Sequence, residues 1–69
     1  MTPDEIRAAR KALGLTQHQM AVLLGFADQP HTKNNLSKLE RGSKTLDPVR
    51  ARLLRAYVDG YRPEDWPSA

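Results

Sequence analysis

The chain has 69 residues, no cysteine and a net charge of +3. This length allows one small domain, and without cysteine neither a disulfide framework nor a thiolate metal site can stabilise it, so tight helix packing or self-association is expected. No apolar run is long enough to cross a bilayer and the N-terminus lacks an apolar signal-peptide core, so we expect a cytosolic protein with no membrane partner.

The positive charge is concentrated in the middle of the chain. Residues 31–55 carry seven basic side chains against two acidic ones, a net +5, whereas residues 1–30 balance at zero and the last fourteen residues carry −2. A concentrated basic surface is typical of proteins that bind a polyanion, although a solvated charged face is an equally good interpretation from charge alone.

The first predicted helix covers residues 3–13. Thr2 and Glu5 have the spacing of a capping box, and Pro3 suits the first helical position. Apolar residues at helical spacing follow until Gly14, which ends the pattern.

The second predicted helix is only about eight residues long, between Thr16 and Gly25. Thr16 and Gln19 repeat the capping-box pattern. Since an isolated helix of this length is marginal in water, we expect it to be held by its neighbours.

The third predicted helix covers residues 33–41, after a polar stretch that Pro30 keeps out of helical geometry. Thr32 is expected to be its N-cap. Leu36 and Leu39 are its apolar residues, so the helix should pack by one narrow edge and turn its other side chains outward.

The fourth predicted helix begins at Asp47–Pro48 and ends near Asp59–Gly60. It carries two apolar stripes. The stripe expected to face the core consists of Val49, Leu53 and Ala56 or Tyr57. The other stripe is a candidate partner surface, or is covered by Trp66 of the C-terminal tail, and consists of Ala51, Leu54 and Val58.

These pieces follow the layout of a helix-turn-helix DNA-binding protein, in which the second helix of the pair enters the major groove by its N-terminal end. The start of the third helix carries Lys33 and Asn34, with Ser37 one turn later. Lysine donates to guanine, asparagine pairs with adenine and serine serves either way, so these residue types suit base recognition.

At this point the chain resembles the lambda-repressor-like (Cro/C1, XRE-type) helix-turn-helix family. The segments "IRAARKALGLTQHQMAVLLG" and "NNLSKLERG" carry the resemblance, which covers about residues 5–58. It implies an all-α, compact domain of four to five helices, with residues 1–60 as the DNA-binding domain. Residues 61–69 form a tail that packs on the last helix or at a dimer interface.

The resemblance also implies roles for individual residues. The positions that match base contacts are Lys33, Asn34, Ser37 and Lys38. The positions assigned to phosphate contacts are Gln17, Thr16, His31, Thr32, Asn35, Arg41, Ser43 and Lys44. Gln17 should also brace the third helix, and Arg10 and Glu40 match a partly buried structural ion pair. The expected dimer interface comprises Ala51, Leu54, Val58 and Trp66.

The sequence departs from the family pattern in two places. The interval from Gly25 to Leu36 is longer than the family's usual turn, and "ADQPH", residues 27–31, is the additional part. It is either a longer arch that reaches a phosphate through His31 or a tolerated loop insertion, and we favour the insertion. The tail is not the family's usual fifth helix.

Other classes of function fit less well. An enzyme or a metal site would need clustered nucleophiles or ligands, but His18 and His31 lie on different predicted elements. We therefore expect no catalytic activity, no bound metal and no cofactor. A module that docks on an acidic protein remains an alternative, although it does not explain the amide side chains beside Lys33.

The size of the chain favours a dimer. A 69-residue domain has a radius of gyration of about 11 Å, so one copy is expected to cover one half-site of an inverted-repeat operator. Short DNA-binding proteins of this kind resemble autorepressors of phages and mobile elements, including those encoded with anti-CRISPR genes. They also resemble antitoxins that bind a cognate toxin. All of these act in the cytoplasm, on the nucleoid of a bacterial host.

Overall fold

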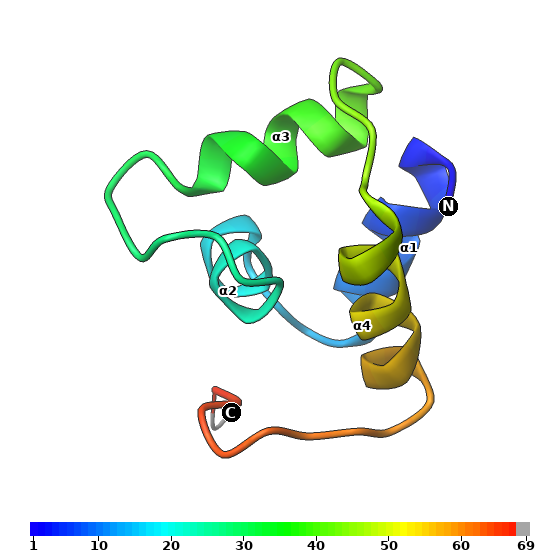
Figure 1. Ribbon diagram of the computed structural model, residues 1–69, viewed down its shortest axis with the longest axis vertical. Coiled ribbons are helices and arrows are strands. Elements are labelled where there is room, and N and C mark those ends of the chain that lie inside the picture. The colour runs from blue at the N-terminus through cyan, green and yellow to red at the C-terminus, as the bar shows by residue number, and fades with distance from the viewer. Residues whose placement is uncertain (68–69) are drawn as a thin grey trace.

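The computed structural model describes residues 1–67, which fold as an all-α domain (Figure 1). Its elements, in chain order, are α1 (Pro3–Ala12), α2 (Gln17–Leu23), α3 (Lys33–Arg41) and α4 (Pro48–Val58). The sequence-based helix boundaries are confirmed to within about two residues, and the described residues contain no fifth helix. None of the four helices has the length and apolar character that a membrane crossing needs.

Side-chain caps explain where three of the helices begin, and at α1 and α2 they are capping boxes, while at α4 the Asp47 carboxylate accepts from the Arg50 N–H at 3.2 Å. Thr2 Oγ1 accepts a hydrogen bond from the Glu5 backbone N–H at 3.1 Å, and the Thr2 N–H donates to Glu5 Oε1 at 2.7 Å. Thr16 and Gln19 make the same reciprocal pair at 3.1 and 3.0 Å. Both predicted capping boxes are therefore present, and each satisfies backbone donors that the first helical turn leaves free.

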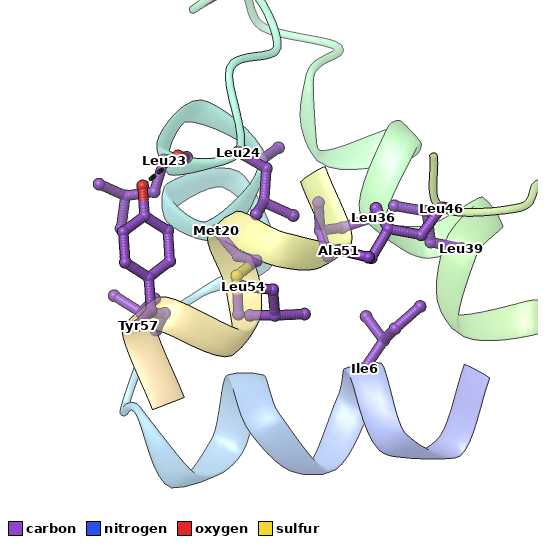
Figure 2. Packing of buried hydrophobic residues seen from close by; sticks show 12 residues of the cluster. Ile6, Met20, Leu23, Leu24, Leu36, Leu39, Leu46, Ala51, Leu54 and Tyr57 are labelled. Atoms are coloured by element: carbon purple, nitrogen blue, oxygen red, sulfur yellow. Dashed lines mark hydrogen bonds between the residues drawn. The ribbon is translucent and has the colours of Figure 1, made fainter. Parts of the chain in front are cut away.

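The core lies where the four helices meet (Figure 2). Leu36 and Leu39 anchor α3 in it, as the sequence predicts. The Tyr57 hydroxyl of α4 donates to the Leu23 carbonyl at the end of α2, at 2.5 Å. The apolar residues buried in this core are Ile6, Leu15, Met20, Ala21, Leu23, Leu24, Leu36, Leu39, Leu46, Ala51, Leu54 and Tyr57.

The buried face of α4 agrees only in part with the one expected from the sequence: Tyr57 is buried and Leu53 packs against the core, but Val49 is not buried. Ala51, Leu54 and Tyr57 point into the core, whereas Val49 is 74% exposed. The sequence offers two apolar stripes on this helix, and Tyr57 is one of the residues expected to face the core, so the difference lies in the other positions. A rotation that buries Leu54 in place of the smaller Val49 removes more apolar surface from water. The prediction of Ala51 and Leu54 as interface residues is wrong, because their side chains are used inside the domain.

The described part of the tail folds back on α4 and runs beneath α2 (Figure 1). The Trp66 ring meets the Tyr57 ring edge-on at 5.2 Å between centroids, and the Tyr61 ring stacks on Tyr57 at 6.0 Å. Arg62 donates to the Tyr57 carbonyl at 2.7 Å, and its guanidinium lies over Trp66. The tail thus covers part of the core at Tyr57, and residues 68–69 of the predicted tail lie outside the described residues.

Candidate nucleic-acid interface

The helix α3 has one buried and one solvent-facing side. Leu36, Leu39 and Glu40 are buried, and their spacing places them on one face of the helix. The polar side chains on the opposite side are free to meet a ligand. The exposed ones are Lys33, Asn34, Lys38 and Arg41, while Asn35 and Ser37 are half-buried. All four residues predicted to contact bases therefore lie on α3, Ser37 being the least accessible of them.

A buried carboxylate fixes α3 on the rest of the domain. Glu40 is only 5% exposed. Its Oε2 accepts a hydrogen bond from Arg10 Nε at 2.7 Å, and its Oε1 accepts one from Gln17 Nε2 at 3.3 Å. Arg10 also donates to the Leu15 carbonyl at 3.1 Å in the turn between α1 and α2. The Arg10–Glu40 ion pair expected from the resemblance is thus present, and it joins three elements.

The charge state of this network follows from its contacts. Burial raises the pKa of Glu40, but the hydrogen bonds from Arg10 and Gln17 and the charges of Arg10 and Arg7 outweigh it, so the pKa lies below its ordinary value. Arg7 contributes from the solvent side, with its Nε 3.6 Å from Glu40 Oε1. Glu40 is therefore ionised at neutral pH.

The start of α2 lies close to α3. Gln17, the first residue of α2, bonds to Glu40, which is the bracing role expected of it. The preceding Thr16 is exposed, and its backbone N–H and hydroxyl oxygen both serve the capping box. Phosphate contacts by Gln17 and Thr16 remain predictions.

The long loop between α2 and α3 is closed by Thr32. Its hydroxyl donates to the Ala27 carbonyl and accepts from the Gln29 N–H at 3.1 Å. Thr32 has helical backbone angles, makes no side-chain cap and is 4% exposed. Thr32 occupies the N-cap position of α3, as predicted, but its side chain does not cap the helix, because its hydroxyl is used inside the loop. The same burial contradicts its predicted contact with a phosphate through the side chain.

Residues 27–31 of this loop are exposed to solvent. His31 is exposed beside the start of α3, and its contact with a phosphate remains a prediction. His18 of α2 bonds through Nε2 to Asp28 Oδ1 at 2.9 Å, a contact between helix and loop that sequence reasoning did not predict. In Figure 1 the loop forms the outermost bend on the α2 side of the domain.

The chain reverses after α3 through Gly42. This residue has φ +80°, in the left-handed region that glycine adopts readily, and the Ser43 N–H donates to the Lys38 carbonyl at 2.9 Å. The reversal brings Lys44 back along α3, where its Nζ donates to Asn35 Oδ1 at 3.3 Å. Arg41, Ser43 and Lys44 are all exposed, as phosphate contacts would require.

Phe26 and Arg50 lie near this reversal and were not singled out from the sequence. The Phe26 ring, just after α2, lies under the cationic groups of Lys44 and Arg50. A lone aromatic residue beside a polar loop is the only sequence signal for this contact, since its two partners are 18 and 24 residues away.

The class of protein follows from this arrangement. The helices α2 and α3 pack against each other, α1 supports α3 through Arg10 and Glu40, and the outer face of α3 is polar and basic. This is the architecture of a helix-turn-helix DNA-binding domain, with a longer connection between the two helices than such motifs usually have.

The comparison with protein families agrees with this architecture. A family model described as Helix-turn-helix matches residues 6–65, and the chain belongs to this family of Cro/C1-type (XRE) domains. The family binds DNA, acts in transcriptional regulation and is not enzymatic. Comparisons with curated proteins and with solved structures gave no significant match.

Proposed function

We propose that this protein is a sequence-specific transcriptional repressor that binds an inverted-repeat operator in double-stranded DNA as a homodimer and blocks a promoter, including that of its own gene. The observation that carries the proposal is the outer face of α3. Lys33 and Asn34 stand exposed at its first turn, on a helix whose opposite face is locked by the buried Glu40 network. Base recognition needs this combination of free polar side chains on a rigid element.

A set of alanine variants tests which residues recognise bases. Lys33→Ala and Asn34→Ala should each weaken operator binding by about 1–3 kcal/mol, roughly tenfold or more, with little change for random duplex. Arg41→Ala should weaken binding to all sequences alike and reduce the salt dependence. Equal losses on operator and random DNA for Lys33→Ala would contradict its assignment to bases. If the wild type bound no duplex even at low salt, a protein partner with an acidic surface would be favoured instead.

The dimensions of the domain support a dimer. Its longest extent is 30 Å, which is shorter than the separation of about 34 Å between successive major-groove faces on one side of DNA. One copy therefore covers one half-site. Two copies related by a two-fold axis match an inverted repeat and double the number of contacts.

The surface around Val58 is where we place the contact between the two copies. Val58 is 52% exposed at the end of α4 and borders a groove of about 500 Å³ against α1. Ala8 and Ala12 line this groove, and it also carries Glu5 and Arg62. In a two-fold arrangement, each copy offers both an acidic and a basic group to its partner, which favours self-association.

A pair of matched variants tests this surface. Val58→Asp should reduce the sedimentation mass to that of a monomer and weaken operator binding, because a charge would be buried at the contact. Val49→Asp places the same charge at the other exposed valine of α4 and should leave the mass unchanged. If the two variants had the same sedimentation mass, the interface would have to lie elsewhere. Trp66 of the tail remains a predicted interface residue and would be tested next.

The biological setting that we propose is the cytoplasm of a bacterial host. There the protein acts as a short autorepressor of the kind that phages and mobile elements carry, with anti-CRISPR association as one such setting. DNase footprinting on the DNA upstream of its own gene should show a protected inverted repeat. Protection of another promoter only would contradict autoregulation. A toxin gene beside its own gene, and co-purification of that toxin, would identify the protein as an antitoxin with the same DNA-binding domain.

A further inference from the structure

One aromatic side chain holds two cations that come from other parts of the chain. Lys44 Nζ lies 4.8 Å from the centroid of the Phe26 ring, and Arg50 Cζ lies 4.2 Å from it. Both distances are those of cation–π contacts. Phe26 follows α2, Lys44 lies in the loop after α3 and Arg50 lies in the first turn of α4. We call Phe26, Lys44 and Arg50 the Phe26 cluster.

The Phe26 cluster adjoins the end of α3 that is expected to enter the major groove. Lys44 Nζ donates to Asn35 Oδ1 at 3.3 Å. Asn35 is the third residue of α3 and directly follows Lys33 and Asn34. The cluster is therefore joined to the first turn of α3, beside the two residues that we propose to contact bases.

The contacts among residues 1–67 do not balance the charges in the cluster. Because both cations lie over one ring, at 4.8 and 4.2 Å from its centroid, they are at most about 9 Å apart and repel each other. Asp47 accepts a hydrogen bond from Arg50 Nη1 at 3.0 Å and offsets one charge. The partner of Lys44 in the described residues is the uncharged amide of Asn35. One positive charge thus remains for an anion to neutralise.

Some hydrogen-bond donors of the cluster make no hydrogen bond among the described residues. An ammonium has three N–H donors and a guanidinium has five, while Lys44 and Arg50 each use one side-chain donor in the contacts described above. Arg50 Nε is buried without a partner among residues 1–67, so the donors that can meet a phosphate are on the terminal nitrogens of this 32% exposed side chain. Because the two cations are at most about 9 Å apart, they can reach phosphates that lie only a few nucleotides apart on one strand, which rises about 3.4 Å per nucleotide.

We propose that the Phe26 cluster is a pre-organised clamp for backbone phosphates of one DNA strand beside the first turn of α3. Phe26 is its positioning residue, and Lys44 and Arg50 bind the phosphates. The ring restricts two long, flexible side chains before DNA arrives, so less conformational freedom is lost on binding. This inference rests on the proposed DNA-binding function and adds Phe26 and Arg50 to the residues that serve it.

Salt titrations with a random-sequence duplex test the clamp. Lys44→Gln and Arg50→Gln should each reduce the slope of log affinity against log salt by about 0.9, the amount expected for one phosphate contact. Phe26→Leu keeps apolar bulk but removes the aromatic face, and it should weaken binding about two- to fivefold per cation held. Phe26→Tyr should bind like the wild type. As a control, Lys11→Gln removes an exposed cation from α1 and should leave the slope unchanged.

A double-mutant comparison separates positioning from folding. In a Lys44→Gln/Arg50→Gln background, Phe26→Leu should have no further effect on DNA affinity, because there is no cation left to position. The same loss in both backgrounds would show that Phe26 acts only through the fold and would overturn the clamp. Unchanged slopes for both cation variants would overturn it as well, even if Phe26→Leu failed to fold. Absence of binding by the wild type would instead contradict the proposed function itself.

Discussion

Replacing Arg10 by methionine tests the central structural element of this domain. The substitution keeps an unbranched apolar stem but removes the guanidinium, which leaves the Glu40 carboxylate buried with Gln17 at 3.3 Å and the more distant Arg7 as its remaining partners. It also removes the donor to the Leu15 carbonyl. Removing one partner of a buried ion pair costs about 3–5 kcal/mol. A domain of this size has a total free energy of unfolding of roughly 3–10 kcal/mol, so we expect Arg10→Met to lose a large fraction of its stability.

Urea denaturation followed by circular dichroism at pH 7 measures this loss. The matched control is Arg7→Met, since Arg7 lies 3.6 Å from the same carboxylate but its side chain is 48% exposed. An exposed partner of this kind contributes about 0–1 kcal/mol. Arg10→Met/Glu40→Leu should recover most of the lost stability, because it removes the unpaired charge together with its partner. A loss of less than about 1 kcal/mol for Arg10→Met would refute the reasoning.

The pH dependence of stability adds an independent check, because the pKa of Glu40 should shift in opposite directions on folding in the wild type and in Arg10→Met. In the wild type the pKa of Glu40 is lowered on folding, so its contribution is present above the unfolded value of 4.5 and is lost as the pH falls. In Arg10→Met, burial without the guanidinium should raise the pKa of Glu40, so the destabilisation is greatest at neutral pH and fades in acid. The stability difference between the two proteins should therefore shrink as the pH falls towards 4, and a constant difference would contradict this account.

Two further substitutions test buried hydroxyl groups. Thr32→Val keeps the side-chain shape but leaves the Gln29 N–H and the Ala27 carbonyl without their partner, so thermal unfolding should show a loss of about 1–3 kcal/mol. Tyr57→Phe removes the hydrogen bond to the Leu23 carbonyl and should cost a similar amount at pH 7. Because burial raises the pKa of Tyr57, the wild type should also lose stability above about pH 10, and Tyr57→Phe should lose less over the same range. No effect of Thr32→Val would show that the loop does not depend on its hydroxyl.

The sequence by itself determined the local structure and the class of protein. Helix ends are marked by the capping boxes at Thr2 and Thr16 and by the glycine at position 42. These interactions span only a few residues, so the helix boundaries that they set do not depend on the rest of the fold. The Arg10–Glu40 ion pair was predictable for a different reason. It links residues 30 positions apart, and only the resemblance to a known family indicated that they meet.

The tertiary structure alone decided which surfaces are free. Leu54 and Val58 belong to the same stripe of α4, yet Leu54 is buried and Val58, the last residue of the helix, is exposed. Thr32 has the residue type of an N-cap, but closing the inserted loop occupies its hydroxyl. Phe26 and Arg50 meet only through the packing of α4 against the end of α2. Periodicity and capping act over a few residues, whereas these contacts depend on how the helices are placed relative to one another.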